Sequence, residues 1–212
     1  MDRVTEAFVW PFRDPEWLTK VLIIALTLLI PIVGSINGIG WMLASLDRLR
    51  AGEERLAPAN LTHLGRGIRV FAVELIYGIG IVAIAAVIFV PALVLEINQG
   101  HGSGNAGLIA AALFLNVFGF SVTTLLSLGL TFATPAIVLV TESGGVGAGV
   151  RVGAVVRRSR MNLTHTLIAG LMLIAASFIG SLGAIVCGIG FLVTSAYALG
   201  MQAWVIHSFE KG

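Results

Sequence analysis

The sequence predicts an all-α integral membrane protein made of helical hairpins, with about five to six membrane segments. Apolar residues make up 57% of the 212 residues, charged residues make up 11%, and the mean hydropathy is +0.97. A typical soluble domain has about 25% charged residues, so such a domain could not bury this much apolar surface. Three windows without Asp, Glu, Lys or Arg are also longer than the roughly 18 residues of a membrane helix, namely residues 21–46, 97–141 and 161–209.

The placement of arginine predicts the topology. Two linkers, residues 47–69 and 142–160, are rich in arginine, whereas the loop at 98–107 and the turn at 180–183 contain neither Lys nor Arg. Cytoplasmic loops of membrane proteins are enriched in Lys and Arg. We therefore expect both linkers on the cytoplasmic side of the membrane and both neutral turns on the outer side.

Two hairpins follow from this topology. Residues 70–95 are expected to pair with a returning arm inside 106–140, as the second hairpin. Residues 161–209 form the third, because about 73 Å of helix at 1.5 Å per residue suffices for two crossings. A straight helix over 106–140 would be about 51 Å long and exceed a hydrocarbon core of about 30 Å. We expect that arm to tilt strongly or to break near Pro135.

The first apolar run, residues 18–46, is too long for one comfortable span and too short for two. Proline, glycine and asparagine gather at its middle, in the stretch IPIVGSINGIG. One interpretation is a re-entrant hairpin that enters and leaves on the cytoplasmic side. The other is a single kinked span that places the N-terminus outside. We favour the re-entrant hairpin, because Trp41 and the charged residues after it resemble an exit at an interface. The side of the N-terminus stays open, and residues 1–212 are expected to form one polytopic domain.

Residues 1–17 are predicted to anchor the chain at the membrane interface through the stretch WPFRDPEW. The anchor residues are Trp10, Phe12, Asp14, Pro15 and Trp17. The aromatic rings are expected at headgroup depth, where amphipathic rings gather. Pro15 suits the first turn of a helix, and Asp14 is placed to cap it. Acidic and basic side chains are mixed in this segment, so we expect no cleavable signal peptide.

Among the polar residues inside the apolar runs, Asn37, Glu74 and Asn116 are the ones expected within the membrane. A carboxylate inside a membrane is costly, which makes Glu74 a functional candidate. However, Glu74 follows Arg69 closely along one helix. A structural ion pair or snorkelling to the interface is therefore the favoured interpretation. The alternative is a proton- or ion-coupled role.

His165 and His207 lie near the inner ends of the third hairpin and are the candidates for binding a haem or chlorophyll. Interfacial histidines bonded to water or backbone are the favoured interpretation. We expect no metal site, because Cys187 has no ligand partners at metal spacing. We expect no nucleic-acid partner, because the basic residues form no stripe with interleaved aromatics. No cofactor is evident, and a bound lipid or pigment stays open.

Glycine is frequent inside the apolar segments. Small residues let helix backbones approach closely inside a membrane. The glycines expected to pack helices are Gly34, Gly38, Gly40, Gly78, Gly80, Gly188 and Gly190. Packing within the chain is the favoured interpretation, and contact with a helix of another subunit is the alternative.

Several stretches together resemble a known family. They are WPFRDPEWLTKVLIIALTLLIPIVG, GIGWMLASLDRLRAGEERLAP, LGRGIRVFAVELIY and, near the end, CGIGFLVTSAYALGMQAW. This order resembles domain-of-unknown-function family 4013, which consists of small multi-pass membrane proteins of bacteria and archaea. The resemblance implies a multi-pass fold in a prokaryotic inner (plasma) membrane. It implies no established activity.

The sequence favours a non-enzymatic accessory or scaffolding subunit that packs against other membrane proteins. Short loops and abundant glycine support this hypothesis, and no residues in a catalytic arrangement are found. The expected partners are the lipid bilayer and other membrane-protein subunits. The alternative is a small transporter or permease, in which the broken first segment and Glu74 line the pathway.

Overall fold

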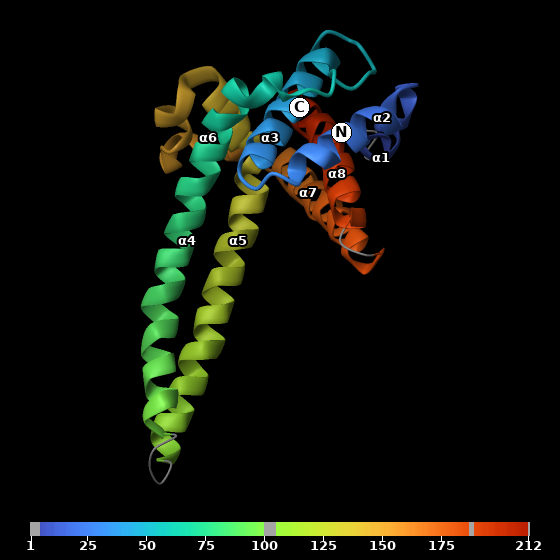
Figure 1. Cartoon of the computed structure of the whole chain (residues 1–212). Coiled ribbons are helices and arrows are strands. Elements are labelled where there is room, and N and C mark those ends of the chain that lie inside the picture. Colours follow the sequence, from blue (N-terminus) through green and yellow to red (C-terminus); the bar gives the residue numbers. More distant parts are fainter. Residues whose placement is uncertain (1–4, 100–104, 187–188, 212) are drawn as a thin grey trace. The chain divides into compact units, whose positions relative to one another are not determined.

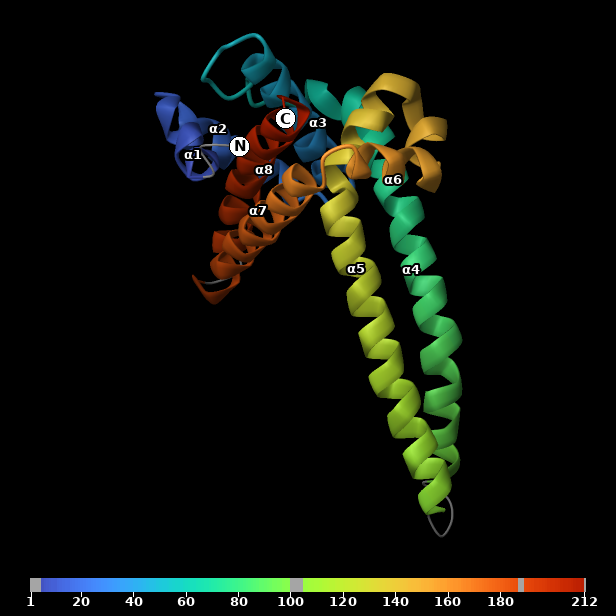
Figure 2. The ribbon, with the colours of Figure 1, turned by 180° about the vertical axis from the view of Figure 1, so that it is seen from behind.

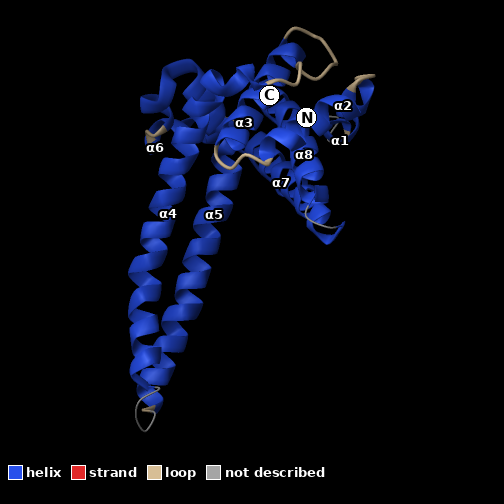
Figure 3. Ribbon diagram, viewed as in Figure 1, coloured by secondary structure: helices blue, strands red, loops and turns tan. Residues whose placement is uncertain are grey.

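The computed structural model describes residues 5–99, 105–186 and 189–211, and this part of the chain is helical without strands (Figure 3). Figure 1 shows the elements in chain order. They are α1 (Glu6–Val9), η1 (Trp10–Arg13), α2 (Trp17–Leu28), α3 (Val33–Arg50), η2 (Leu61–His63), α4 (Leu64–Gln99), α5 (Ala106–Gly149), α6 (Val152–Arg160), α7 (Leu163–Leu182), η3 (Gly183–Val186) and α8 (Ile189–Lys211).

The chain divides into two compact units. The first, here called the core unit, comprises Met1–Val73 and Thr131–Gly212, and the second, the hairpin unit, is Glu74–Leu130. In the core unit, α8 packs against α7, α3, α2 and the N-terminal helices. Its interior side chains are apolar, as expected for the contact faces of packed helices. Among those that are almost fully buried are Trp41, Leu43, Leu46, Met201, Val205 and Ile206.

The first apolar run is broken, as its sequence predicts. Helix α2 ends at Leu28 and α3 begins at Val33, and between them Ile32 adopts φ 65°, a rare conformation for a β-branched residue. A Cβ added at Gly34 would lie 2.1 Å from the carbonyl oxygen of Thr27, so glycine is required where α3 turns back onto α2. The 12 residues of α2 give about 18 Å of helix, which is less than a bilayer core. The re-entrant path itself stays a prediction.

The second hairpin is longer than predicted. Helix α4 begins at Leu64 and ends at Gln99, so it extends beyond both ends of the predicted 70–95. Helix α5 continues to Gly149, beyond the predicted end at residue 140. Within the hairpin unit the two arms run side by side in both views (Figure 1, Figure 2). They approach closely at Gly119, where an added Cβ would lie 2.8 Å from Ile88 and 3.0 Å from Phe89. Small residues therefore set the spacing of these arms.

The break in the returning arm lies at a different residue from the predicted one. Helix α5 continues through Pro135, and its non-helical residue is Gly145, with φ 73° and ψ −173°. Only glycine adopts this conformation readily. Proline can be accommodated in an apolar helix when nearby groups satisfy the backbone that it leaves unpaired. Of the two predicted alternatives, the break near Pro135 was therefore wrong in its position, and the strong tilt stays a prediction.

The third hairpin consists of α7 and α8, which pack along each other. Helix α7 ends at Leu182, and the connection begins with η3 at Gly183, the last residue of the predicted turn 180–183. Gly183 and Gly190 face each other across it, since a Cβ on Gly183 would lie 2.2 Å from the carbonyl oxygen of Gly190. The hydroxyl of Thr194 donates to the carbonyl oxygen of Gly180 at 2.6 Å.

Three described helices are long and apolar enough to cross a membrane. They span Leu61–Ile97, Ala106–Gly149 and Leu163–Leu182. Helix α2 is apolar but shorter, and α3 and α8 do not reach the same combination of length and apolar character. The structure thus supplies three of the predicted five to six segments, and the others stay predictions.

Candidate functional site

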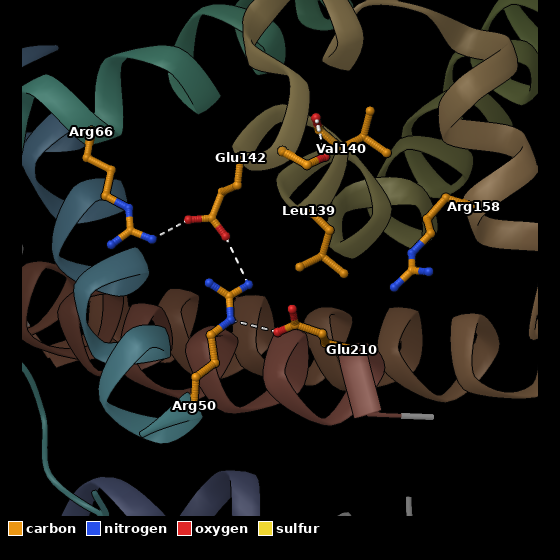
Figure 4. A pocket seen from close by; sticks show the side chains of 8 residues that line it. Arg50, Arg66, Leu139, Val140, Glu142, Arg158 and Glu210 are labelled. Atoms are coloured by element: carbon orange, nitrogen blue, oxygen red, sulfur yellow. Dashed lines mark hydrogen bonds and ion pairs between the residues drawn. The ribbon is translucent and has the colours of Figure 1, made fainter. Parts of the chain in front are cut away.

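Five charged side chains of the core unit form an ionic cluster around Arg50. Its members are Asp47 and Arg50 on α3, Arg66 on α4, Glu142 on α5 and Glu210 on α8. The Nε atom of Arg50 donates to Oε2 of Glu210 at 2.7 Å, and its Nη2 donates to Oε2 of Glu142 at 3.1 Å (Figure 4). Its Nη1 donates to Oδ1 of Asp47 at 3.1 Å, one turn earlier on the same helix.

Arg66 binds two of the same carboxylates from the beginning of α4. Its guanidinium donates to both oxygens of Asp47, with Nη2 3.1 Å from Oδ1, and to Oε1 of Glu142. Glu142 therefore bridges two arginines, and its side chain is only 16% exposed. Charge-assisted hydrogen bonds are roughly twice as strong as neutral ones. The cluster links the end of α3 to three other helices.

The contacts within the cluster favour the charged forms of Asp47 and Arg50. Burial alone would raise the pKa of Asp47, but hydrogen bonds and charge from Arg66 and Arg50 outweigh burial and lower it. Burial alone would lower the pKa of Arg50, but Glu210 and Glu142 outweigh burial and raise it. Each charge thus stabilises its partners at neutral pH.

A pocket of about 630 Å³ lies beside the cluster. Its lining comprises Arg50, Arg66, Leu139, Val140, Glu142, Ser143, Arg158 and Glu210. Arg158 projects from α6, and Figure 4 shows its guanidinium on the opposite side of the pocket from Arg66. The contact recorded for this guanidinium is with the sulfur of Met161, at 4.0 Å. Two of the three lining arginines are thus neutralised by carboxylates, and Arg158 can bind an anionic group.

The comparison with protein families assigns this chain to a family. The family described as "Protein of unknown function (DUF4013)" matches residues 23–189. The chain belongs to this family. The resemblance stated from the sequence is thus confirmed, although the match begins after the WPFRDPEW stretch and ends before Glu210. The comparisons with curated proteins and with solved structures gave no match.

Trp10 of this DUF4013 protein is an interior residue, and its predicted place at headgroup depth stays a prediction. Its side chain is 1% exposed, and its indole N–H donates to the carbonyl oxygen of Gly200 on α8 at 3.2 Å. The nearby Tyr197 hydroxyl donates to the carbonyl oxygen of Phe8. Two hydrogen bonds thus attach the N-terminal segment to α8. A buried indole N–H requires such a partner, but sequence alone does not identify it.

The other predicted anchor residues take different positions. Phe12 is exposed and Trp17 is half-buried, and their rings meet edge to face at 4.6 Å. Pro15 is exposed and precedes α2, which begins at Trp17 with Glu16 as its N-cap, so the prediction that Pro15 occupies the first turn was wrong. Anchoring of the chain in a membrane by these residues stays a prediction.

Asp14 is almost completely buried and binds three groups. Its carboxylate accepts hydrogen bonds from Nζ of Lys20 at 2.7 Å, from the N–H of Glu16 at 2.9 Å and from the N–H of Leu56 at 2.9 Å. Burial alone would raise the pKa of Asp14, but Lys20 and the backbone donors outweigh burial and lower it. Asp14 precedes Glu16, the N-cap of α2, so the prediction that Asp14 caps the helix was wrong. Its carboxylate instead attaches the linker after α3 to the N-terminal segment.

The three polar residues expected within the membrane do not form one site, because each has different contacts. Glu74 is half-buried on α4, and its carboxylate accepts no hydrogen bond from the described residues of the hairpin unit. Asn37 is buried, and its Nδ2 donates to the carbonyl oxygen of Asn60 at 2.9 Å. Asn116 donates to Oε1 of Glu96 at 2.7 Å and thereby joins the two arms of the hairpin unit. The ion-coupled role of Glu74 stays a prediction.

The two candidate histidines lie on adjacent helices. His165 is in the first turn of α7, where its backbone N–H donates to the Asn162 side chain at 3.3 Å. His207 is near the end of α8, and its Nδ1 atom is buried without a hydrogen-bond partner among the residues that the structure describes. No group of three or more metal-binding side chains occurs among the described residues. A cofactor at either histidine stays a prediction.

The glycines fall into two groups. In the core unit, a Cβ added at Gly40 would lie 2.1 Å from the carbonyl oxygen of His63, and one at Gly38 would lie 2.8 Å from Leu199. Gly34 and Gly190 have the close contacts described above, and Gly188 is outside the described residues. By contrast, Gly78 and Gly80 have no neighbouring atom within 4 Å of an added Cβ.

Two further packing glycines were not predicted from the sequence. A Cβ at Gly67 would lie 1.8 Å from the carbonyl oxygen of Ile36, and one at Gly170 would overlap the ring of Phe132. Gly67 and Gly40 together form the close crossing of α4 over α3. The LGRGIR stretch could have indicated Gly67, since it places a second glycine in the first turns of a long helix.

Proposed function

We propose that this DUF4013 protein is a multi-pass membrane protein that acts as a non-enzymatic accessory or scaffolding subunit. The apolar surface of its hairpin supports the proposal. Only 6% and 11% of the most apolar windows of α4 and α5 are buried within the chain. Apolar side chains face outward on both arms, among them Ile79, Val82, Val87, Leu113, Phe114, Val117, Phe120 and Leu125. A surface of this size requires lipid or protein around it.

The glycines on the surface of the hairpin unit indicate that part of its apolar surface packs against another protein. Gly78, Gly80 and Gly129 lie on the arms of the hairpin unit with open space beside them. Lipid chains gain nothing specific from a glycine, whereas a second helix can approach its backbone closely and gain packing contacts. A partner helix from another membrane protein is therefore the occupant we propose for these positions.

The orientation we propose follows from the arginines. Arg151, Arg157, Arg158 and Arg160 lie between α5 and α7, and Arg48 and Arg50 lie at the end of α3. By the positive-inside rule both linkers belong on the cytoplasmic side of a prokaryotic inner membrane. Cysteine-accessibility labelling at Arg55 and at Asn105 would give opposite sides if this orientation is right.

Mild solubilisation from the native membrane tests the accessory role. We expect wild-type protein to co-purify with another membrane protein at fixed stoichiometry, measured by mass spectrometry. The Gly78→Leu/Gly80→Leu variant should lose the partner, while the Gly65→Leu control, which also has open space beside it, should retain it. A stable wild-type monomer without any stoichiometric partner would contradict the proposal.

The small transporter is a second candidate, and the break between α2 and α3 favours it. Discontinuous helices at membrane depth provide substrate sites in known transporters. Here the break places Ile32 in an unusual conformation beside the glycine-rich start of α3. Proton and ion flux in proteoliposomes, compared between wild type and Glu74→Gln, tests this candidate. Equal and negligible flux in both proteins would exclude it.

A further inference from the structure

The position of α6 in the chain places it at a membrane surface. It occupies the short connection between α5 and α7, and both of these helices are long and apolar enough to cross a membrane. On the membrane topology proposed above, α7 enters the bilayer within three residues of the end of α6, so α6 lies at that interface. Val155 is buried and attaches α6 to the core unit.

The arginines of this connection differ from those of the other segments in their ion pairs. Arg13, Arg48, Arg50 and Arg66 each form an ion pair with an acidic side chain. In the described part of the chain, no carboxylate pairs with any of the four arginines of the α6 segment, which are Arg151, Arg157, Arg158 and Arg160. Their charge is therefore available to an external anion.

Exposed apolar side chains flank these arginines. Val152 and Val156 on α6 are exposed, and so are Met161 and Leu163 directly after it. Helices that combine basic and apolar residues in this way lie in the plane of the interface, with the apolar groups among the acyl chains. A dissolved phosphate would leave these apolar groups uncovered, whereas a phospholipid covers them and supplies the anion.

We propose that the α6 segment, residues 151–163, binds the headgroups of anionic phospholipids. Arg157 and Arg160 are exposed and contact headgroup phosphates at the surface. Arg158 lines the 630 Å³ pocket, where Arg50 and Arg66 are already neutralised by carboxylates. Arg158 is thus the lining arginine that receives a phosphate, and the pocket holds the polar part of one lipid.

Lipid binding to purified protein in a neutral sugar detergent tests this site. Native mass spectrometry would compare retention of phosphatidylglycerol with retention of phosphatidylcholine. We expect phosphatidylglycerol to be preferred in wild type, and each arginine replaced by glutamine to weaken its binding by about five-fold. The test variants are Arg157→Gln/Arg160→Gln and Arg158→Gln. The control Arg55→Gln removes an exposed arginine outside α6 and should leave binding unchanged.

Four further results decide between the lipid site and its alternatives. Arg157→Lys/Arg160→Lys keeps the charge and should retain most of the preference, which separates binding from misfolding. Equal retention of the two lipids by wild type would overturn the proposal, as would unchanged binding in the glutamine variants. If inorganic phosphate alone displaced phosphatidylglycerol, the ligand of the site would be a dissolved phosphate, and the proposal that it binds a lipid would be wrong. The assay uses the protein without partners, so its result does not depend on the accessory role.

Discussion

The indole nitrogen of Trp10 lies 3.2 Å from the carbonyl oxygen of Gly200, so a residue near the N-terminus binds the last helix of the chain. The two residues are 190 positions apart. A Cβ added at Gly200 would make only ordinary contacts, 3.5 Å from Leu56, 3.7 Å from Pro11 and 3.9 Å from the Trp41 ring, so the hydrogen bond does not require glycine at this position. The N-terminal segment is therefore part of the packed core unit.

Replacing Trp10 should destabilise the core unit. Trp10→Ala removes a large buried side chain and should lower the free energy of unfolding by about 3–5 kcal/mol. Trp10→Phe keeps a ring but loses the hydrogen bond, and should cost about 1 kcal/mol for that bond. Thermal unfolding in detergent would measure both. Phe12→Ala, an exposed control, should have little effect, and equal midpoints for Trp10→Ala and Phe12→Ala would contradict the buried position.

Asp14 should make stability depend on pH in the acidic range. Its pKa in the folded protein lies below the ordinary 3.8. The stabilisation is complete above 3.8, because the carboxylate is then ionised in both states, and it decreases as the pH falls below that value. Unfolding midpoints of wild type and Asp14→Asn should differ at neutral pH and converge in acid. A difference that is independent of pH would exclude an ionised Asp14.

Two glycines of the same helix should respond in opposite ways to alanine. At Gly67 the new methyl group would overlap the carbonyl oxygen of Ile36, so Gly67→Ala should cost about 1–3 kcal/mol by overpacking. At Gly78 it meets open space, and Gly78→Ala should gain up to about 1 kcal/mol in helix propensity. Thermal unfolding of the isolated protein measures both changes. Equal destabilisation would mean that α4 does not cross α3 at Gly67.

Helix positions could be predicted well from the sequence, because apolar windows and glycine or proline interruptions are local signals. Pro31 and Gly34 correctly indicated the break between α2 and α3. The same kind of signal failed at Pro135. There the helix continues, and the chain bends at Gly145, where the apolar window has ended. A proline shows where a break is possible, but the surroundings decide whether it forms.

The charged cluster could not be predicted, because its contacts are non-local. Arg66 and Glu142 are 76 positions apart, and Arg50 and Glu210 are 160 positions apart. Sequence periodicity shows which face of a helix is polar, but not which helix ends meet. The burial of Trp10 against α8 could not be predicted for a related reason. An aromatic residue beside charged residues fits a membrane interface and a packed helix end equally well.

Glu142 should matter more for stability than an exposed acidic residue. Glu142→Gln removes the charge that bridges Arg50 and Arg66 and should cost about 1–3 kcal/mol, as for hydrogen bonds to charged groups. The control Glu54→Gln removes the partner of Arg13, but its side chain is 62% exposed, and such a pair contributes less than about 1 kcal/mol. Thermal unfolding compares the two variants. Equal midpoints would show that the bridging contacts add nothing.

The Asn116–Glu96 hydrogen bond should hold the two arms of the hairpin unit together. Asn116→Leu removes the donor and should cost about 0.6 kcal/mol, the average for a polar contact between helices in a membrane. Glu96→Gln should be nearly neutral, because an amide oxygen can accept the same bond from Nδ2. Disulfide cross-linking between cysteines placed at Ile88 and Gly119, which lie in contact, would measure how often the arms separate. Cross-linking should slow in Asn116→Leu and not in Glu96→Gln. An equal rate in all three proteins would mean that apolar packing alone pairs the arms.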